Sequence, residues 1–217
     1  MPIEVRPILP VDLDLLERGC AVETLAFAKN VTPVSSVVFV GPFPETEAQD
    51  KAKDMAKAMR EEGFRLFGAF DTDVEGPDAL LGWAKWFVYE EATPKPKPRV
   101  FSPGVNPETA AVMFGAIDSV RERNITGKPC VYLNVLVVHP DHQGRGIGKQ
   151  LMSWGMQEAV RLNIPAWLEA SPAGKFLYEK CGFKVIDTIV EPFDRFGVDS
   201  SFTVWGMQWD VPNNRCA

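Results

Sequence analysis

Residues 131–159 read VYLNVLVVHPDHQGRGIGKQLMSWGMQEA, and this stretch decides the fold of the chain. Its first part, residues 131–138, is apolar except for Asn134 and rich in β-branched types, which predicts a strand covered on both faces. Pro140 ends that strand, because proline has no N–H to give to a sheet. Beyond it the pattern changes to a glycine-rich turn and then to a helix.

The turn consists of Gln143-Gly-Arg-Gly-Ile-Gly148, in which every second residue is glycine and the backbone can adopt conformations that other residues resist. Small and apolar residues then recur at three- and four-residue steps, which predicts a helix with one buried face. They are Leu151, Met152, Gly155, Ala159 and Leu162. A helix that begins in such a turn directs unpaired N–H groups and its positive dipole end toward the turn. The stretch therefore predicts a cradle for a pyrophosphate.

Two common phosphate-binding motifs do not fit the spacing of this turn. A dinucleotide fingerprint needs a third glycine where the chain has Lys149. A nucleotide P-loop needs glycine at position 143 and Ser or Thr at position 150, and both positions hold glutamine. The remaining pattern, Gln-x-x-Gly-x-Gly after an apolar strand, resembles the coenzyme A signature of the GNAT acetyltransferase superfamily.

A second match follows about thirty residues further on. Residues 166–183 read AWLEASPAGKFLYEKCGF and resemble the next strand and helix of the same family. The resemblance is specific over residues 80–209 and weaker before them. It implies an α/β fold of the GNAT type, with a mixed, mostly antiparallel central sheet, central strands that splay apart, and helices on both faces.

The resemblance also implies where acetyl-CoA binds as co-substrate. The backbone of the glycine-rich turn would hold the pyrophosphate, and the end of the preceding strand would pair with the pantetheine arm. Ser171 occupies a position where many relatives have an asparagine that contacts this arm, but capping of the next helix alone would explain the serine. The implied cofactor-binding residues are Leu136, Val137, Val138, Gln143, Gly144, Arg145, Gly146, Ile147, Gly148, Lys149 and Ser171.

Two residues are candidates for acid–base catalysis. Tyr178 matches the tyrosine that in the family gives a proton to the departing thiolate, although a tyrosine here could also be a packing residue. The central strand has no acid where relatives often have a glutamate, so Glu169 on the neighbouring strand is the candidate general base. His139 and His142 lie three residues apart without a third ligand, and we expect no metal site.

Net charge, length and cysteine spacing indicate which partners, domain organisation and location to expect. The chain has 217 residues and a net charge of −6, which disfavours nucleic acids and anionic membranes as partners. Its length suits one domain over residues 1–217, with an acceptor-side part at 1–79 and an acetyl-CoA-binding core at 80–211. The sequence is compatible with a homodimer. The four cysteines, Cys20, Cys130, Cys181 and Cys216, are widely spaced and indicate reduced thiols and a cytoplasmic location, with the nucleus as an alternative.

Outside the two signatures, local patterns predict the remaining elements. Asp12 is expected to cap the first helix, and Thr46 with Gln49 is expected to form a capping box for a second. Residues 31–44 contain three prolines and a glycine and are expected to form an ordered loop that could wall the acceptor pocket. Strands are expected at 3–8, 65–70, 80–90, 166–170, 184–190 and 201–210, and a helix at 107–123.

From these observations we predict an acetyl-CoA-dependent N-acetyltransferase that transfers an acetyl group to a primary amine of a small molecule by direct attack. A protein lysine or N-terminal acetyltransferase is the alternative among enzymes. A non-catalytic acyl-CoA-binding module is the alternative from another class, because the central strand lacks a glutamate.

Overall fold

The computed structural model describes residues 2–212. The strands are β1 (Ile3–Pro7), β2 (Phe64–Asp71), β3 (Leu80–Tyr89), β4 (Cys130–Val138), β5 (Ala166–Ala170), β6 (Lys184–Pro192) and β7 (Ser201–Trp209). The α-helices are α1 (Leu13–Lys29), α2 (Pro33–Val38), α3 (Glu47–Ala58), α4 (Pro107–Asn124), α5 (Ile147–Leu162) and α6 (Pro172–Lys180). Three short 3-10 helices are η1 (Pro77–Ala79), η2 (Pro140–His142) and η3 (Asp194–Phe196).

All seven strands form one sheet in the order β1-β2-β3-β4-β5-β7-β6. Every neighbouring pair is antiparallel except β4 and β5, which are parallel. The predicted α/β class with a mixed, mostly antiparallel sheet is therefore confirmed. Both edge strands are amphipathic rather than apolar, with β1 at one edge and β6 at the other.

Strands β4 and β5 separate soon after they meet. Their register contains three pairs, from Val131 opposite Ala166 to Leu133 opposite Leu168. Strand β4 then continues to Val138 along β3, without a strand on its other side. This is the predicted splay, and it opens the middle of the sheet between the two parallel strands.

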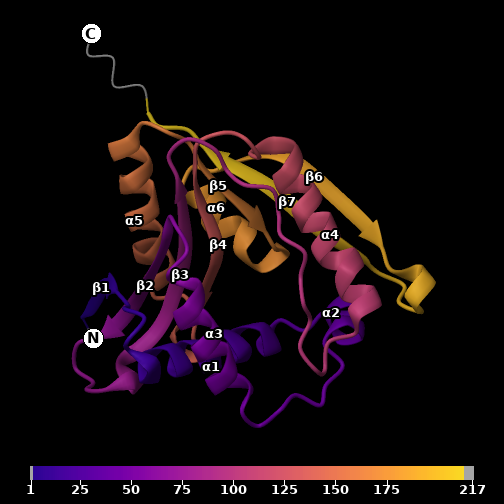
Figure 1. The fold of residues 1–217 in the computed structure, drawn as a ribbon, viewed down its shortest axis with the longest axis horizontal. Helices are drawn as coiled ribbons and strands as arrows, with labels where there is room; N and C mark the ends of the chain where they lie inside the picture. Colours follow the sequence, from indigo (N-terminus) through magenta and orange to yellow (C-terminus); the bar gives the residue numbers. More distant parts are fainter. Residues whose placement is uncertain (1, 213–217) are drawn as a thin grey trace.

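Helices cover both faces of the sheet (Figure 1). Helix α5 packs on β2, β3 and β4, and α6 packs on β5 and β7; we call their side the α5 face. Helix α1, with α3 against it, packs on β3 and β4 of the opposite face, and α4 packs there on β5, β7 and β6. We call this second side the α4 face. Apolar clusters fill both sides, so the sheet is the middle layer of three.

A β-bulge in β4 changes the side to which its residues point. The pairing with β3 passes from Leu133 opposite Trp86 to Val135 opposite Lys85, so Asn134 is an extra residue. Leu133 packs in the α5-face cluster, and after the bulge Leu136 does so again, although the two are three positions apart. The bulge lies where β5 leaves β4, and Asn134 lies on the α4 face with Tyr132, to whose hydroxyl oxygen its amide donates.

The expected loop at residues 31–44 is partly wrong, because residues 33–38 form α2. Thr32 caps this helix by accepting a hydrogen bond from the Ser35 N–H, and the Ser35 hydroxyl oxygen accepts one from the Thr32 N–H. Pro33 occupies the first helical position, where its missing N–H costs nothing. The prolines that suggested a loop thus include one that starts a helix.

Two predicted caps are also wrong in detail. Helix α1 does begin after Asp12, but the Asp12 carboxylate accepts a hydrogen bond from the Leu9 N–H outside the helix. Helix α3 begins after Thr46, whose hydroxyl donates to Asp50 instead of accepting from the backbone, and no capping box forms. By contrast, Asn106 caps α4 as predicted, accepting from the N–H groups of Glu108 and Thr109.

Candidate functional site

The glycine-rich turn lies at the end of β4 and runs directly into α5. After the short helix η2, Gln143 is extended, Gly144 and Gly146 have φ of +76° and +79°, and Gly146 is the N-cap of α5. A Cβ added at either glycine would meet nothing within 4 Å. The positive φ explains why glycine is required there, and the open space leaves the main chain approachable by a ligand.

Side chains around the turn hold it in shape or stay exposed. The Gln143 amide donates to the Val138 carbonyl oxygen at 3.1 Å, which ties the turn to the end of β4. Ile147 is buried in the α5-face cluster, and Gly148 packs so closely that an added Cβ would lie 2.9 Å from Leu177 of α6. Arg145, whose guanidinium lies 3.1 Å from the His142 ring, and Lys149 are both exposed. A diphosphate at this helix end would meet main-chain N–H groups with cationic side chains at the edge.

The edge of β4 that faces β5 is unpaired by any strand from Asn134 onward. Leu136, Val137 and Val138 lie on this part of the strand, and their other edge pairs with Ala84, Trp83 and Gly82 of β3. An extended ligand carrying amides could add to this edge as a strand would. The predicted pantetheine contacts therefore fall where the sheet has free hydrogen-bonding capacity.

Tyr178 lies on α6, on the α5 face, and is 8% exposed. Within residues 2–212 its hydroxyl has no hydrogen-bond partner, although its ring packs edge-on against Phe183 at 6.3 Å. Burial raises the pKa of this phenol, so the hydroxyl keeps its proton at neutral pH. Gly174 makes room for the ring, because a Cβ there would lie 2.8 Å from the ring and 3.3 Å from the hydroxyl oxygen. The result is a protonated donor with an unused hydrogen bond.

Ser171 precedes α6 and accepts a long hydrogen bond, 3.4 Å, from the Gly174 N–H. This is the capping arrangement that the sequence offered as an alternative explanation of the serine. Ser171 is exposed at the end of β5, on the strand that leaves β4. The cap accounts for the residue type, and a contact with the pantetheine arm stays a prediction.

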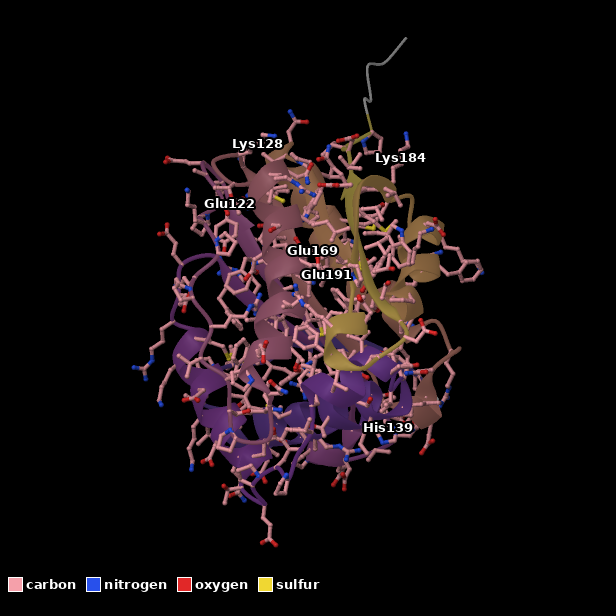
Figure 2. The ribbon with its side chains drawn as sticks, turned by 90° about the vertical axis from the view of Figure 1, so that its right-hand side faces the viewer. Glu122, Lys128, His139, Glu169, Lys184 and Glu191 are labelled. Carbon is pink, nitrogen blue, oxygen red and sulfur yellow. The ribbon has the colours of Figure 1, made fainter. Side chains whose placement is uncertain are left out.

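Glu169 lies on β5 with its side chain turned to the α4 face, where four donors surround it. Arg121 of α4 approaches both carboxylate oxygens at 3.4 Å. The Tyr132 hydroxyl donates at 2.8 Å and the Trp167 indole N–H at 2.7 Å. The side chain is only 5% exposed, and in the view of Figure 2 Glu169 projects near the centre, with Lys128 and Lys184 toward the upper edge.

Burial raises the pKa of Glu169, while Arg121 and the neutral donors oppose the shift. Burial also raises the pKa of Tyr132, and the charge of Glu169 adds to this shift, so the phenol remains a donor. Tyr132 gives its proton to the carboxylate and therefore accepts from the Asn134 amide nitrogen, 3.1 Å away. Among residues 2–212, no group then donates to the side-chain carbonyl oxygen of Asn134, which lies at the bulge where the strands separate.

Sequence reasoning missed Arg121 and Tyr132 as parts of this cluster. Both had been assigned to regular elements, and the ion pair with Glu169 joins residues 48 positions apart, which no local pattern reveals. The signal that could have indicated it is Glu169 itself, a carboxylate in an otherwise apolar strand, which requires a buried cation or several donors nearby. His139 and His142 lie at the other end of the site, beside η2 (Figure 2 labels His139). In residues 2–212, no group of three or more His, Cys, Asp or Glu side chains could hold a metal ion.

The splayed parallel pair, the free edge of β4 and the glycine-capped α5 together match what the two sequence signatures imply. A family model for the acetyltransferase (GNAT) domain matches residues 108–185. This part of the chain is similar to the GNAT acetyltransferase domain. The matched range contains α4, β4, the glycine-rich turn, α5, β5 and α6, which are the elements that build the site. At the level of the family, this confirms both the resemblance read from the motifs and the predicted class of enzyme.

Solved structures with the GNAT fold resemble the whole chain. An acetyltransferase of Corynebacterium glutamicum, described as histone acetyltransferase HPA2 and related acetyltransferase, is 18% identical with a TM-score of 0.57 and full coverage of both chains. The yncA protein of Salmonella typhimurium, a putative acetyltransferase solved with its cofactor acetyl-CoA, is 16% identical with a TM-score of 0.54, covering 99% of this chain and 97% of that one. At such identities the likeness concerns the fold.

A curated relative matches a short segment only. The probable acyltransferase SID5 of Ajellomyces capsulatus is 42% identical over 40 residues, which are 18% of this chain and 29% of the relative's length. The chain thus spans under a third of the length of the curated relative that it matches. Among residues 2–212, no helix has the length and the apolar content needed to cross a membrane.

Proposed function

We propose that this protein is an acetyl-CoA-dependent N-acetyltransferase that acetylates a primary amine of a small molecule by direct attack. The observation that carries the proposal is the opening between β4 and β5, which has the glycine-rich turn at one end and an unpartnered phenol on the α5 face. The open space at Gly144 and Gly146 is compatible with a diphosphate such as that of coenzyme A, because no side chain there stands between a ligand and the main chain.

In the proposed reaction, each step is assigned to residues of this chain. Bound acetyl-CoA supplies a thioester whose C–S bond breaks when the amine nitrogen attacks the carbonyl carbon. Tyr178 gives its hydroxyl proton, or a hydrogen bond, to the departing sulfur. The side-chain carbonyl oxygen of Asn134 accepts a hydrogen bond from the amine. This bond orients the lone pair of the amine nitrogen toward the thioester carbonyl carbon.

Glu169 is proposed as the general base, with the Tyr132 hydroxyl as intermediary. Hydrogen-bond donors surround the Glu169 carboxylate, so the amine does not reach it directly. The amine would give its proton to the Tyr132 hydroxyl oxygen, and Tyr132 would give its own proton to Glu169 across 2.8 Å. The raised pKa of Glu169, caused by burial, supports this role, because a more basic carboxylate accepts a proton more readily. In the wild type kcat/KM should fall toward low pH as Glu169 is protonated, and Glu169→Gln should remove this pH dependence. An unchanged fall of kcat/KM toward low pH in the variant would exclude Glu169 as the base.

A small acceptor is favoured over a protein tail by what covers the α4 face. The connector between β3 and α4 runs along this face (Figure 1) and is fixed by ion pairs at both sides. Lys97 pairs with Glu61 at 3.0 Å, and Arg99 pairs with Asp118 of α4 at 2.7 Å. A short isolated bridge also joins Phe39, just after α2, to Val105, just before α4. A covered face suits a compact amine better than an extended polypeptide.

The test is release of free thiol from acetyl-CoA in the presence of polyamines, amino acids, aminoglycosides, arylamines and peptides. Turnover with a small amine at a higher kcat/KM than with any peptide is expected. Preference for peptides would favour the protein acetyltransferase instead. Calorimetric binding of acetyl-CoA without thiol release from any amine would identify a binding module. The cytoplasmic location and the homodimer stay predictions from the sequence.

A further inference from the structure

Lys85 is a charged residue in the middle of the sheet that the proposed reaction does not use. It lies on β3 directly opposite Val135, the residue that follows the bulge at Asn134. Trp83 and Phe87, two positions to either side on the same strand, pack with the α1 and α3 cluster, so Lys85 also points to the α4 face. Its side chain is therefore next to the place proposed for the acceptor amine.

The charge of Lys85 is not matched by a direct partner. Within the described part of the chain, no carboxylate oxygen lies within 4.0 Å of its ammonium group, and it makes no hydrogen bond. Two other cations of this face do have direct partners: Arg99 is bonded to Asp118 at 2.7 Å, and Arg121 to Glu169 at 3.4 Å. Lys85 still retains some contact with solvent, as do Phe87, Tyr89, Asn134 and Val135 around it, although all five belong to central strands.

The groups that surround Lys85 come from α1, β3 and the connector. Burial lowers the pKa of Lys85, Glu23 of α1 opposes this shift from beyond contact distance, and Arg99 adds to it. Glu23 already accepts a hydrogen bond from the Trp83 indole N–H at 3.1 Å. The Cys20 thiol is neutral at pH 7, because burial raises its pKa to about 12. Burial is the main cause that disfavours the ammonium form of Lys85, and an anion beside it would favour that form.

We propose that Lys85 binds an acidic group of the acceptor, so that the substrate is a small primary amine that also carries a carboxylate. This inference rests on the proposed function and specifies its substrate class. A single unmatched cation suits a monoanion such as a carboxylate, whereas a phosphate brings about 1.5 to 2 negative charges. The carboxylate would bind at Lys85 while the amine of the same molecule lies at Asn134, which fixes the amine in front of the opening.

If Lys85 acted as a general base instead of binding a carboxylate, its substitution would have a different effect on the rates of acetylation. A lysine whose pKa is lowered by burial could act as a neutral general base. In that case its loss would slow acetylation of every amine alike. Binding of a carboxylate predicts instead that only acceptors with that group are affected.

The experiment compares amines that differ by the carboxylate: 4-aminobutyrate with butylamine, alanine with ethylamine, and lysine with cadaverine. For each pair kcat/KM is measured by thiol release in the wild type, Lys85→Met and Lys85→Arg. The wild type should prefer the carboxylated member of at least one pair by about 10- to 100-fold. Lys85→Met should remove that preference by slowing only the carboxylated member, through KM, and Lys85→Arg should restore part of it.

Lys57→Met is the matched control. Lys57 is an exposed lysine of α3 that pairs with Asp54 at 2.9 Å, and its loss should leave the preference unchanged. Equal rates for both members of every pair in the wild type would overturn the inference alone, as would an equal loss for both members in Lys85→Met. Absence of thiol release with all amines would overturn the proposed function and this inference with it.

Discussion

The two faces of the sheet differ in the kind of atom that they offer a ligand. On the α5 face, the glycine-rich turn and the free edge of β4 present main-chain N–H and C=O groups. On the α4 face, the strands present charged and polar side chains: Lys85, Tyr132, Asn134 and Glu169. Recognition by main chain depends on where the backbone runs and tolerates many changes of side chain. Recognition by side chains can change with a single substitution.

This difference teaches how one fold can hold a constant partner and a variable one. Coenzyme A would be held by the part of the molecule that is set by turn geometry and strand separation. The acceptor would be selected by side chains and by α2 and α4, which lie outside the glycine signature. Five substitutions test the contrast, and they are ordered by the size of the expected effect.

Tyr178 is the side chain on the α5 face that should matter most for the chemistry. Tyr178→Phe removes only the unpartnered hydroxyl, and we expect kcat to fall about 100- to 10,000-fold because the departing thiolate loses its proton donor. The affinity for acetyl-CoA, measured by calorimetry, should stay within about threefold, since binding rests on main-chain groups. Undiminished kcat would remove Tyr178 from the mechanism.

Arg121 tests how far the α4 face depends on matched charges. Arg121→Met leaves the Glu169 carboxylate buried without its cation, which should cost about 3–5 kcal/mol in the free energy of unfolding, measured with urea. It should also raise the pKa of Glu169 further and move the low-pH limb of kcat/KM to higher pH, because a base must be ionised to act. Arg161→Met is the control: that arginine is paired with Glu158 on the surface, and its loss should cost under about 1 kcal/mol.

Gly146 tests the main-chain side of the comparison. Gly146→Val should weaken acetyl-CoA binding at least about 100-fold, because the side chain enters space that is empty in the free protein but required by the diphosphate. Gly127→Val is a close control, since Gly127 has nearly the same φ, +77°, and equally open space far from the turn. It should share the backbone strain but keep normal binding.

Lys149→Ala completes this test. If the diphosphate is held by N–H groups, loss of the exposed Lys149 side chain should weaken acetyl-CoA binding less than about tenfold. A larger loss than in Gly146→Val would reverse the proposed division of labour between backbone and side chains. Calorimetric titration of all three variants under one ionic strength makes the comparison direct.

Asp187 should give the smallest effect. It joins β6 to α4 by accepting hydrogen bonds from Arg123 and Asn124. The bond from Arg123 is the larger of the two causes, and both hold the pKa of the Asp187 carboxyl below the usual range. Asp187→Asn should cost about 0.5 kcal/mol at pH 7. Because folding lowers this pKa, the stabilisation is present above the unfolded value near ~4 and disappears as the pH falls through the folded value. Urea unfolding of both proteins should therefore converge toward acid pH.

The sequence predicted the cofactor side better than the acceptor side, for a physical reason. The strand at 130–138, the turn at 143–148 and the helix that follows are consecutive, so their relation is local and periodicity reveals it. The strand at 166–170 was predicted at its observed ends, because Pro165 and Ser171-Pro172 mark them.

The α4 face could not be predicted in the same way. Its polar cluster joins Arg121, Tyr132 and Glu169 from three elements, and Lys85 from a fourth, and only the folded sheet brings them together. Helix α2 was missed because its signal is four residues long, a threonine and serine around a proline, within a stretch that otherwise favours a loop. The bulge at Asn134 leaves no mark in an apolar run that reads as a regular strand.

That bulge allows the strand to lose one residue without exchanging its faces. With Asn134 removed, Leu133 would still lie opposite Trp86 and Val135 opposite Lys85, so the side chains from Val135 to Val138 would keep their hydrophobic layers. The deletion would instead remove the amide that meets Tyr132 at the point where β4 and β5 separate. Removing a neighbouring residue of a regular strand would move every later side chain to the other face, so Asn134 is the one position of this strand where a polar group can be deleted while the packing is kept.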